Sequence, residues 1–259
     1  MNTKYPIILV HGIIIKDIKF IKSFGNIDRI LRIQGHHVYK SNVDGVGTIE
    51  NNASMLKEEI LSILEKEKVD KVNIIAHSKG GLDSKYMIQQ LGMEDHVASL
   101  TTLCTPHKGS PIAENILKLP KWILKFIAFW VNLVYKIFGD KHPDSLKVCE
   151  QLSPVNSYLT ETISISDKVY TQSYSTTLNK SKDDFVMGIP LAFSHHFEKK
   201  DSDGVVSNDS AKFGEYHESA INDSVSHSEI IDFMVNKKKK DKIYSFYSSL
   251  CEDLVKKGF

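Results

Sequence analysis

The sequence has few of the cross-links that hold small secreted or metal-bound domains together. Its 259 residues include only three cysteines, Cys104, Cys149 and Cys251. An odd number of cysteines at such wide spacing argues against both a disulfide framework and a zinc site. Net charge is also nearly absent, at +1. The charge balance therefore gives no indication of a nucleic acid or a strongly acidic partner, and we predict no nucleic-acid binding.

Long hydrophobic runs are missing as well. A comfortable membrane span needs about 20 apolar residues, and the very apolar stretch from Trp122 to Phe138 is shorter and carries Lys125, Asn132 and Lys136. The first apolar run has no basic segment before it and no small-residue cleavage site after it. We therefore expect a cytoplasmic protein, with secretion after removal of a signal peptide as the alternative.

Hydrophobic residues make up 41% of the chain, enough for one sizeable core, so we expect a single domain over residues 1–259. Short apolar runs alternate with segments of helical periodicity. The runs typical of buried strands are Ile7–Val10, His37–Lys40, Val72–Ala76, Val97–Leu103 and Lys168–Thr176. This order predicts an α/β fold with a mainly parallel central sheet and helices on both faces. The end of the chain is again helical, and we expect the Lys237–Lys240 run before it to be a solvated turn.

The strongest local signal is the segment Ala76-His77-Ser78-Lys79-Gly80, between a predicted strand and a predicted helix. Small residues two positions before and after a serine allow a tight strand-to-helix turn that exposes the hydroxyl. Ser78 would then lie at a helix N-terminus, where free N–H groups favour developing negative charge. The alternative is a serine that only caps the helix. We predict Ser78 as the nucleophile.

A second motif, Val10-His11-Gly12-Ile13, follows the first strand. A tetrahedral intermediate needs two fixed N–H donors for its oxyanion. We predict the backbone N–H groups of Ile13 and Lys79 in that role, and a loop-packing role for His11.

A serine nucleophile also needs an imidazole base and a carboxylate that orients it. The order Ser78, Asp203, His227 matches the chain order of the α/β-hydrolase triad. An Asp-Gly turn after a strand would place Asp203 at the carboxyl edge of the sheet. Competing candidates remain at this stage: Asp201 and Asp209 for the acid, and His195, His196 and His217 for the base. For His107, in a turn after the fourth strand, we expect a structural role.

Together, the segments YPIILVHG, VNIIAHSKGGLDSKYM, LTTLCTPHKGSPIAE, DGVVS and VSHSEIID resemble the bacterial true-lipase branch of the α/β hydrolases. The resemblance implies the α/β-hydrolase fold and places the triad on Ser78, Asp203 and His227. It also implies a helical lid, which we place in an insertion at about residues 112–160. Some members bind a structural calcium near the triad. Glu229 stands where those members have a ligand Asp, but we find no second carboxylate for it and predict no metal and no cofactor.

In the predicted lid, Lys121, Lys125, Asn132 and Lys136 fall on one narrow stripe of a helix and the other positions are apolar. We predict that Trp122, Phe126, Phe129 and Trp130 belong to a lid that binds substrate and makes transient contact with a lipid surface. The alternative is a fixed cap helix.

The motifs predict a serine hydrolase that cleaves carboxylic esters, lipid-like or small, through an acyl-enzyme. The same triad also serves thioesterases, acyltransferases and amidases. A function of another class, an inert scaffold that binds an apolar ligand, is the remaining alternative.

Overall fold

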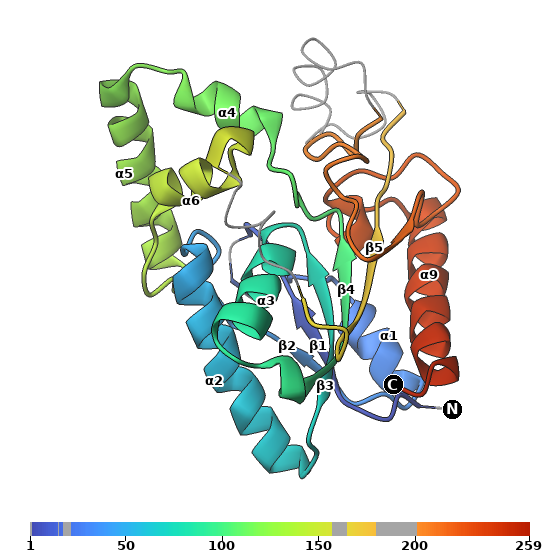
Figure 1. The fold of residues 1–259 in the computed structure, drawn as a ribbon. Coiled ribbons are helices and arrows are strands. Elements are labelled where there is room, and N and C mark those ends of the chain that lie inside the picture. The colour runs from blue at the N-terminus through green and yellow to red at the C-terminus, as the bar shows by residue number, and fades with distance from the viewer. Residues whose placement is uncertain (1, 15, 18–21, 157–164, 180–200) are drawn as a thin grey trace.

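Six short strands form one parallel sheet at the centre of the protein (Figure 1). The structure, a computed structural model, describes residues 2–14, 16–17, 22–156, 165–179 and 201–259. In sheet order the strands are β2 (Val38–Lys40), β1 (Ile7–Val10), β3 (Val72–His77), β4 (Val97–Leu103), β5 (Tyr170–Tyr174) and β6 (Glu215–His217). Every neighbouring pair is parallel. The predicted α/β class and parallel sheet are confirmed.

Helices cover both faces of the sheet because its inner strands are apolar on both sides. In β1, Ile7 and Leu9 pack into one core with α1 (Ile27–Ile33) and α9 (Lys237–Lys256). Ile8 and Val10 point to the opposite face and pack with α2 (Ile49–Glu67) and α3 (Lys79–Gln90). This alternation is the two-residue period of a strand. It explains why β1 appears in the sequence as a continuous apolar run.

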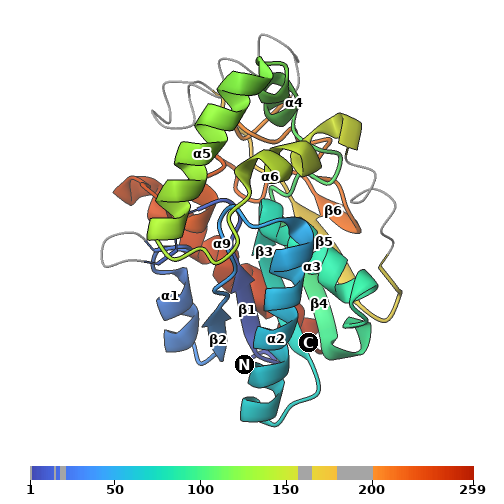
Figure 2. The ribbon, with the colours of Figure 1, turned by 90° about the vertical axis from the view of Figure 1, so that its left-hand side faces the viewer.

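Three further helices lie beyond the carboxyl edge of the sheet, where Figures 1 and 2 show them above the strand ends. They are α4 (Pro111–Leu117), α5 (Lys121–Ile137) and α6 (Ser145–Leu152). We call these three helices the cap. Short 3-10 turns occur at Glu94–His96, Pro154–Asn156 and Glu229–Ile231. In the part of the chain that the structure describes, no helix combines the length and the apolar character needed to cross a membrane.

The predicted turn at Lys237–Lys240 is wrong, because these lysines form the first turn of α9. The Asn236 side chain caps that helix by accepting from the Lys239 N–H. Two of the lysines are also neutralised, since Lys239 pairs with Glu229 and Lys240 with Asp232. Paired charges and a cap allow a helix to begin inside a run of like charges.

Candidate active site

Ser78 lies on the tight turn between β3 and α3, in a backbone conformation that only close packing maintains. Its φ and ψ are 54° and −131°, a region that costs a non-glycine residue about 1–3 kcal/mol. Its N–H donates to the Leu103 carbonyl oxygen at 2.9 Å. Two glycines admit the turn: a Cβ on Gly12 would lie 2.7 Å from the Ser78 Cβ, and one on Gly80 would lie 2.5 Å from the His11 oxygen. The turn therefore presents the Ser78 hydroxyl at the carboxyl edge of the sheet.

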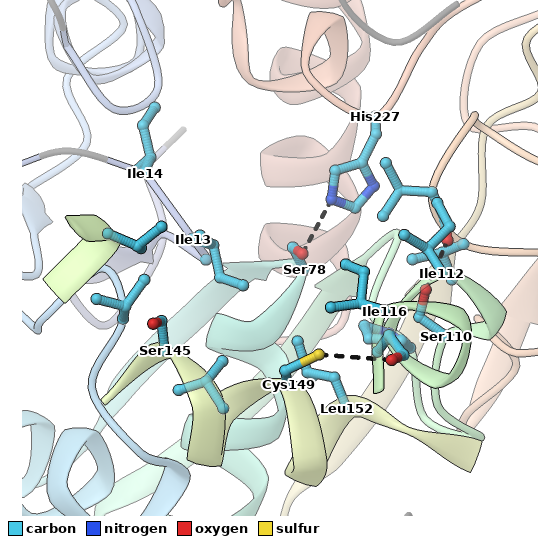
Figure 3. A pocket seen from close by; sticks show the side chains of 18 of the residues that line it. Ile13, Ile14, Ser78, Ser110, Ile112, Ile116, Ser145, Cys149, Leu152 and His227 are labelled. Carbon is cyan, nitrogen blue, oxygen red and sulfur yellow. Dashed lines mark hydrogen bonds between the residues drawn. The ribbon is translucent and has the colours of Figure 1, made fainter. Parts of the chain in front are cut away.

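The structure brings the three predicted catalytic side chains into one hydrogen-bonded line. Ser78 Oγ lies 2.9 Å from His227 Nε2, as the dashed line in Figure 3 marks. His227 Nδ1 lies 2.7 Å from Asp203 Oδ2. With the Nδ1 proton on the carboxylate side, Nε2 is free to accept the serine proton. This is the geometry of an activated nucleophile.

Asp203 is almost fully buried and held in a tight turn that an antiparallel bridge between Ser202 and Ser207 closes. Its Oδ1 accepts the N–H groups of Val205 and Val206 at 2.9 and 2.8 Å. Its carbonyl oxygen accepts the His227 N–H at 3.0 Å. One carboxylate oxygen is thus fixed by the backbone, and the other is aimed at the imidazole. The sequence predicted that this turn follows a strand, and the residues directly before it, 180–200, lie outside the described residues.

His77 contacts both the backbone and the ring of His227, a role that the sequence did not indicate. Its Nε2 donates to the His227 carbonyl oxygen at 2.9 Å, and the two ring centroids lie 4.6 Å apart. Burial lowers the pKa of His77 well below its ordinary value. The ring therefore stays neutral and adds no positive charge beside His227.

Cys104 lies behind Asp203, and burial raises the pKa of its thiol well above the ordinary value. It is therefore no competing nucleophile at neutral pH. Among the described residues, Cys104, Asp203 and His227 are a group whose possible ligand atoms lie within 4.8 Å of one another. Because Asp203 and His227 already bind each other, we assign no metal to this group.

Ile13 and Lys79, the predicted oxyanion donors, lie near Ser78 on two different elements. Ile13 lines the same cavity as Ser78, and Figure 3 places it beside the serine. Lys79 is the first residue of α3, where backbone N–H groups have no partner within the helix. The position of a Cβ on Gly12 lies 3.1 Å from the Lys79 nitrogen, so the two donor segments are in contact.

The competing acids and bases lie elsewhere or are otherwise engaged. Asp201 is exposed, and the half-buried Asp209 forms ion pairs with two lysines. The His217 ring stacks on Tyr174. His195 and His196 lie outside the described residues. Two further histidines are buried structural groups, as expected: His11 bonds to the Gly12 carbonyl, and His107 stacks on a phenylalanine.

A cavity of about 470 Å³ opens beside the Ser78 hydroxyl, between the sheet edge and the cap (Figure 3). None of the described side chains that line it is an acidic residue, a lysine or an arginine. The α5 residues that line it are Leu124, Ile127, Ala128 and Val131. The side chains predicted to contact substrate, Trp122, Phe126, Phe129 and Trp130, do not line this cavity, because they lie on the opposite, outward face of α5 and are 50–72% exposed.

Glu229, two residues after His227 and considered above as a calcium ligand, forms an ion pair with a lysine. Its carboxylate accepts from Lys239 Nζ at 2.9 and 2.7 Å and from the Ser226 N–H at 3.0 Å. The side chains are 4% and 12% exposed, so the pair is shielded from water. This ion pair ties the His227 loop to the first turn of α9.

We expect Lys239→Met to destabilise the protein by about 3 kcal/mol, because it leaves a buried carboxylate without its cation. Urea unfolding measures the effect. Lys242→Met is the matched control. It removes the same charge from the exposed pair with Asp223, so the free energy of unfolding should fall by about 1 kcal/mol or less. Equal losses in the two variants would contradict a structural role for the Glu229 pair.

Known lipases are similar to this chain in sequence and in fold. The chain is 29% identical to triacylglycerol lipase 2 of Saccharomyces cerevisiae over 265 residues, which covers 90% of this chain and 73% of the yeast protein. It is 33% identical to a triacylglycerol lipase of Pseudarthrobacter phenanthrenivorans over 151 residues, 54% of this chain and 46% of that protein. Among solved structures, a Staphylococcus hyicus lipase superimposes with a TM-score of 0.76 at 16% identity, over 98% of this chain and 97% of that one.

The family model described as "PGAP1-like alpha/beta domain" matches residues 39–176, just over half of the chain. That segment contains the Ser78 turn, three of the six strands in full and the cap helices. The chain therefore belongs to the PGAP1-like alpha/beta domain family, with an α/β-hydrolase fold.

Proposed function

We propose that the protein is a serine hydrolase that cleaves carboxylic esters with an apolar acyl group, through an acyl-enzyme on Ser78. The observation that carries the proposal is the position of the hydrogen-bonded Ser78–His227–Asp203 line at the wall of an uncharged, largely apolar cavity. A cavity of about 470 Å³ lies within the usual range of ligand pockets, roughly 300–1,000 Å³. The triacylglycerol lipases among the relatives favour an ester over the thioester or amide alternatives.

The reaction follows from the hydrogen-bonded line. Ser78 Oγ forms a bond to the ester carbonyl carbon while His227 Nε2 takes its proton, and the carbonyl electron pair moves onto oxygen. The N–H groups of Ile13 and Lys79 bind that oxyanion. As the bond to the alcohol breaks, His227 returns the proton to the leaving oxygen. Water then repeats the sequence on the acyl-serine and releases the acid, while Asp203 stays ionised throughout.

A series of p-nitrophenyl esters with acyl chains of about two to about eighteen carbons tests the function. Each methylene that enters the cavity gains about 0.8 kcal/mol, so kcat/KM should rise about fourfold per methylene and level off once the cavity is full. A thioester and an amide of the best acyl group decide between the reaction classes. No hydrolysis of any ester, or no dependence on chain length, would contradict the proposal.

The outward face of α5 supports a further part of the proposal, contact with a lipid surface. Of the fifteen large hydrophobic side chains exposed on the described chain, eleven lie between Ile116 and Phe138. A patch of this kind on a soluble domain marks an interaction site. On α5 this patch borders the exposed Lys121 and Lys125, which suit the headgroup level of a bilayer. The inward face of the same helix lines the cavity, so a lipid surface would bind next to the entrance for its own esters.

Adding vesicles should therefore shift the tryptophan emission and raise activity together, since Trp122 and Trp130 are the only tryptophans. Each exposed indole gains about 1 kcal/mol or more on leaving water, so Trp122→Ser with Trp130→Ser should weaken vesicle binding at least about tenfold. Hydrolysis of a small soluble ester should change little. The control is Ile33→Ser, which removes an equally exposed apolar side chain from α1. Constant emission, with both substrates affected alike, would identify a fixed cap without lipid contact.

A further inference from the structure

The loop from Asp44 to Gly47 lies where three parts of the active site meet. Asp44 is fully buried, and its carboxylate receives three donors. Lys16 Nζ, from the loop that follows Ile13, lies 2.9 Å from Oδ1. The N–H groups of Lys141 and His142, just beyond the end of α5, donate at 2.9 and 2.6 Å. One carboxylate therefore holds both the loop that carries Ile13 and Lys16, which we call the oxyanion loop, and the segment just after α5.

The same residue is joined to the other oxyanion donor through buried side chains. The Asn52 side chain accepts from the Asp44 N–H at 3.2 Å and donates to its carbonyl oxygen at 2.7 Å. Asn52 Nδ2 also donates to Asp83 Oδ2 at 3.0 Å. Both Asp83 oxygens accept from Lys79 Nζ, at 2.8 and 2.9 Å. Each of these four side chains belongs to a residue that is at most 1% exposed, so a continuous polar chain runs from Asp44 to Lys79.

Close packing reinforces these bonds. A Cβ on Gly45 would collide with the Ile14 carbonyl oxygen and with the ring of Tyr135 on α5. The Asp44–Gly47 loop is thus closely packed between the oxyanion loop and α5. Asp140 fixes it from the cap side by accepting the N–H groups of Gly45 and Val46 at 3.1 and 2.9 Å.

Buried ion pairs are costly to form and are weak evidence for stability by themselves. Here the two pairs, Lys16–Asp44 and Lys79–Asp83, each include a residue of a segment that carries an oxyanion donor. We propose that Asp44 is a positioning residue. It fixes the position of the oxyanion loop through Lys16 and links that loop to the segment just after α5. The inference rests on the proposed function, since it assumes that Ile13 and Lys79 bind the oxyanion.

Lys16→Met tests the proposal, because it removes the tether of the oxyanion loop and leaves Asp44 with its backbone donors. A donor displaced by about 1 Å can cost about a hundredfold in rate. On p-nitrophenyl butyrate we expect kcat to fall about tenfold to a hundredfold, with KM nearly unchanged. Affinity for butylboronic acid, whose serine adduct places an oxygen in the oxyanion hole, should fall in parallel. Lys16→Arg should restore most of the rate.

Two further variants separate positioning from general stability. Asp44→Asn should lower kcat similarly, and the double variant with Lys16→Met should be no worse than the poorer single one, because both remove the same interaction. Lys168→Met, which removes an exposed ion pair with Asp95, is the control and should leave kcat unchanged. If Asp44→Asn does not fold, Lys16→Met and its arginine rescue decide the matter alone.

An unchanged kcat in folded Lys16→Met, or a loss confined to KM, would overturn the proposal while wild-type activity upholds the hydrolase function. A wild-type protein with no activity on any ester would instead overturn the proposed function, and with it this inference.

Discussion

Replacing Ser78 with alanine is expected to lower kcat by about 10⁵-fold to 10⁶-fold, with the fold intact. The hydroxyl lies within hydrogen-bond distance of His227 Nε2, and the acyl-enzyme cannot form without it. Binding and the oxyanion donors would leave a residual rate about 10³–10⁴ above water. Hydrolysis of p-nitrophenyl butyrate measures the loss, and circular dichroism checks the fold.

The matched control for this substitution is Ser145→Ala, which removes a hydroxyl from another serine that lines the same cavity. Among the described residues, its Oγ makes one long hydrogen bond, 3.5 Å from the Ala128 carbonyl oxygen. We expect Ser145→Ala to retain wild-type kcat. Near-wild-type turnover in folded Ser78→Ala would show that the nucleophile lies elsewhere.

Asp203→Asn is expected to lower kcat by about 10⁴-fold. Oδ1 of Asp203 accepts two backbone N–H groups, so the asparagine oxygen will take that position and its amide group will face His227 Nδ1. An amide donor there forces Nδ1 to accept, which moves the ring proton to Nε2 and removes the base from Ser78. The predicted tautomer change is visible in the nitrogen chemical shifts of the His227 ring.

Asp201→Asn is the control for this prediction, since Asp201 lies two residues away with an exposed side chain. It should keep nearly full activity. An inactive Asp201→Asn together with an active Asp203→Asn would show that Asp201, and not Asp203, is the acid.

The sequence predicted best where one local pattern determined the structure. Strands β1 and β4 have the predicted bounds: β1 is a continuous apolar run, and β4 is a fully buried run of apolar and small residues with two threonines. Two short elements were not predicted, α1 with two buried residues and β6 with three residues in all. Elements of this size carry too few periodic positions for a pattern, and packing on the sheet decides their conformation.

The orientation of α5 shows a different limit. Its periodicity separates a polar stripe from apolar positions, but both the inward and the outward arcs are apolar. Periodicity therefore could not tell Leu124 and Val131, which line the cavity, from Trp122 and Phe126, which face outward. The tertiary placement of α5, which Figure 2 shows beside α6 and above the strands, decides which arc faces the cavity.

The ion pairs around the site could not be predicted from the sequence either. Lys239 pairs with Glu229 because a 3-10 turn and the start of α9 lie side by side, and Lys16 pairs with Asp44, which is far from it in the sequence. A lysine near a carboxylate in the sequence is common and uninformative. Burial of both charges makes these pairs significant, and burial is a property of the tertiary structure.

The most direct test of the central claim is covalent labelling with a fluorophosphonate, followed by peptide mass spectrometry. The hydrogen-bonded line from Asp203 to Ser78 predicts one phosphonate per chain, attached to Ser78, and no labelling of Ser78→Ala or of protein unfolded beforehand. Wild-type protein that stays unlabelled, or carries the phosphonate on another residue, would contradict the assignment of Ser78 as the activated nucleophile.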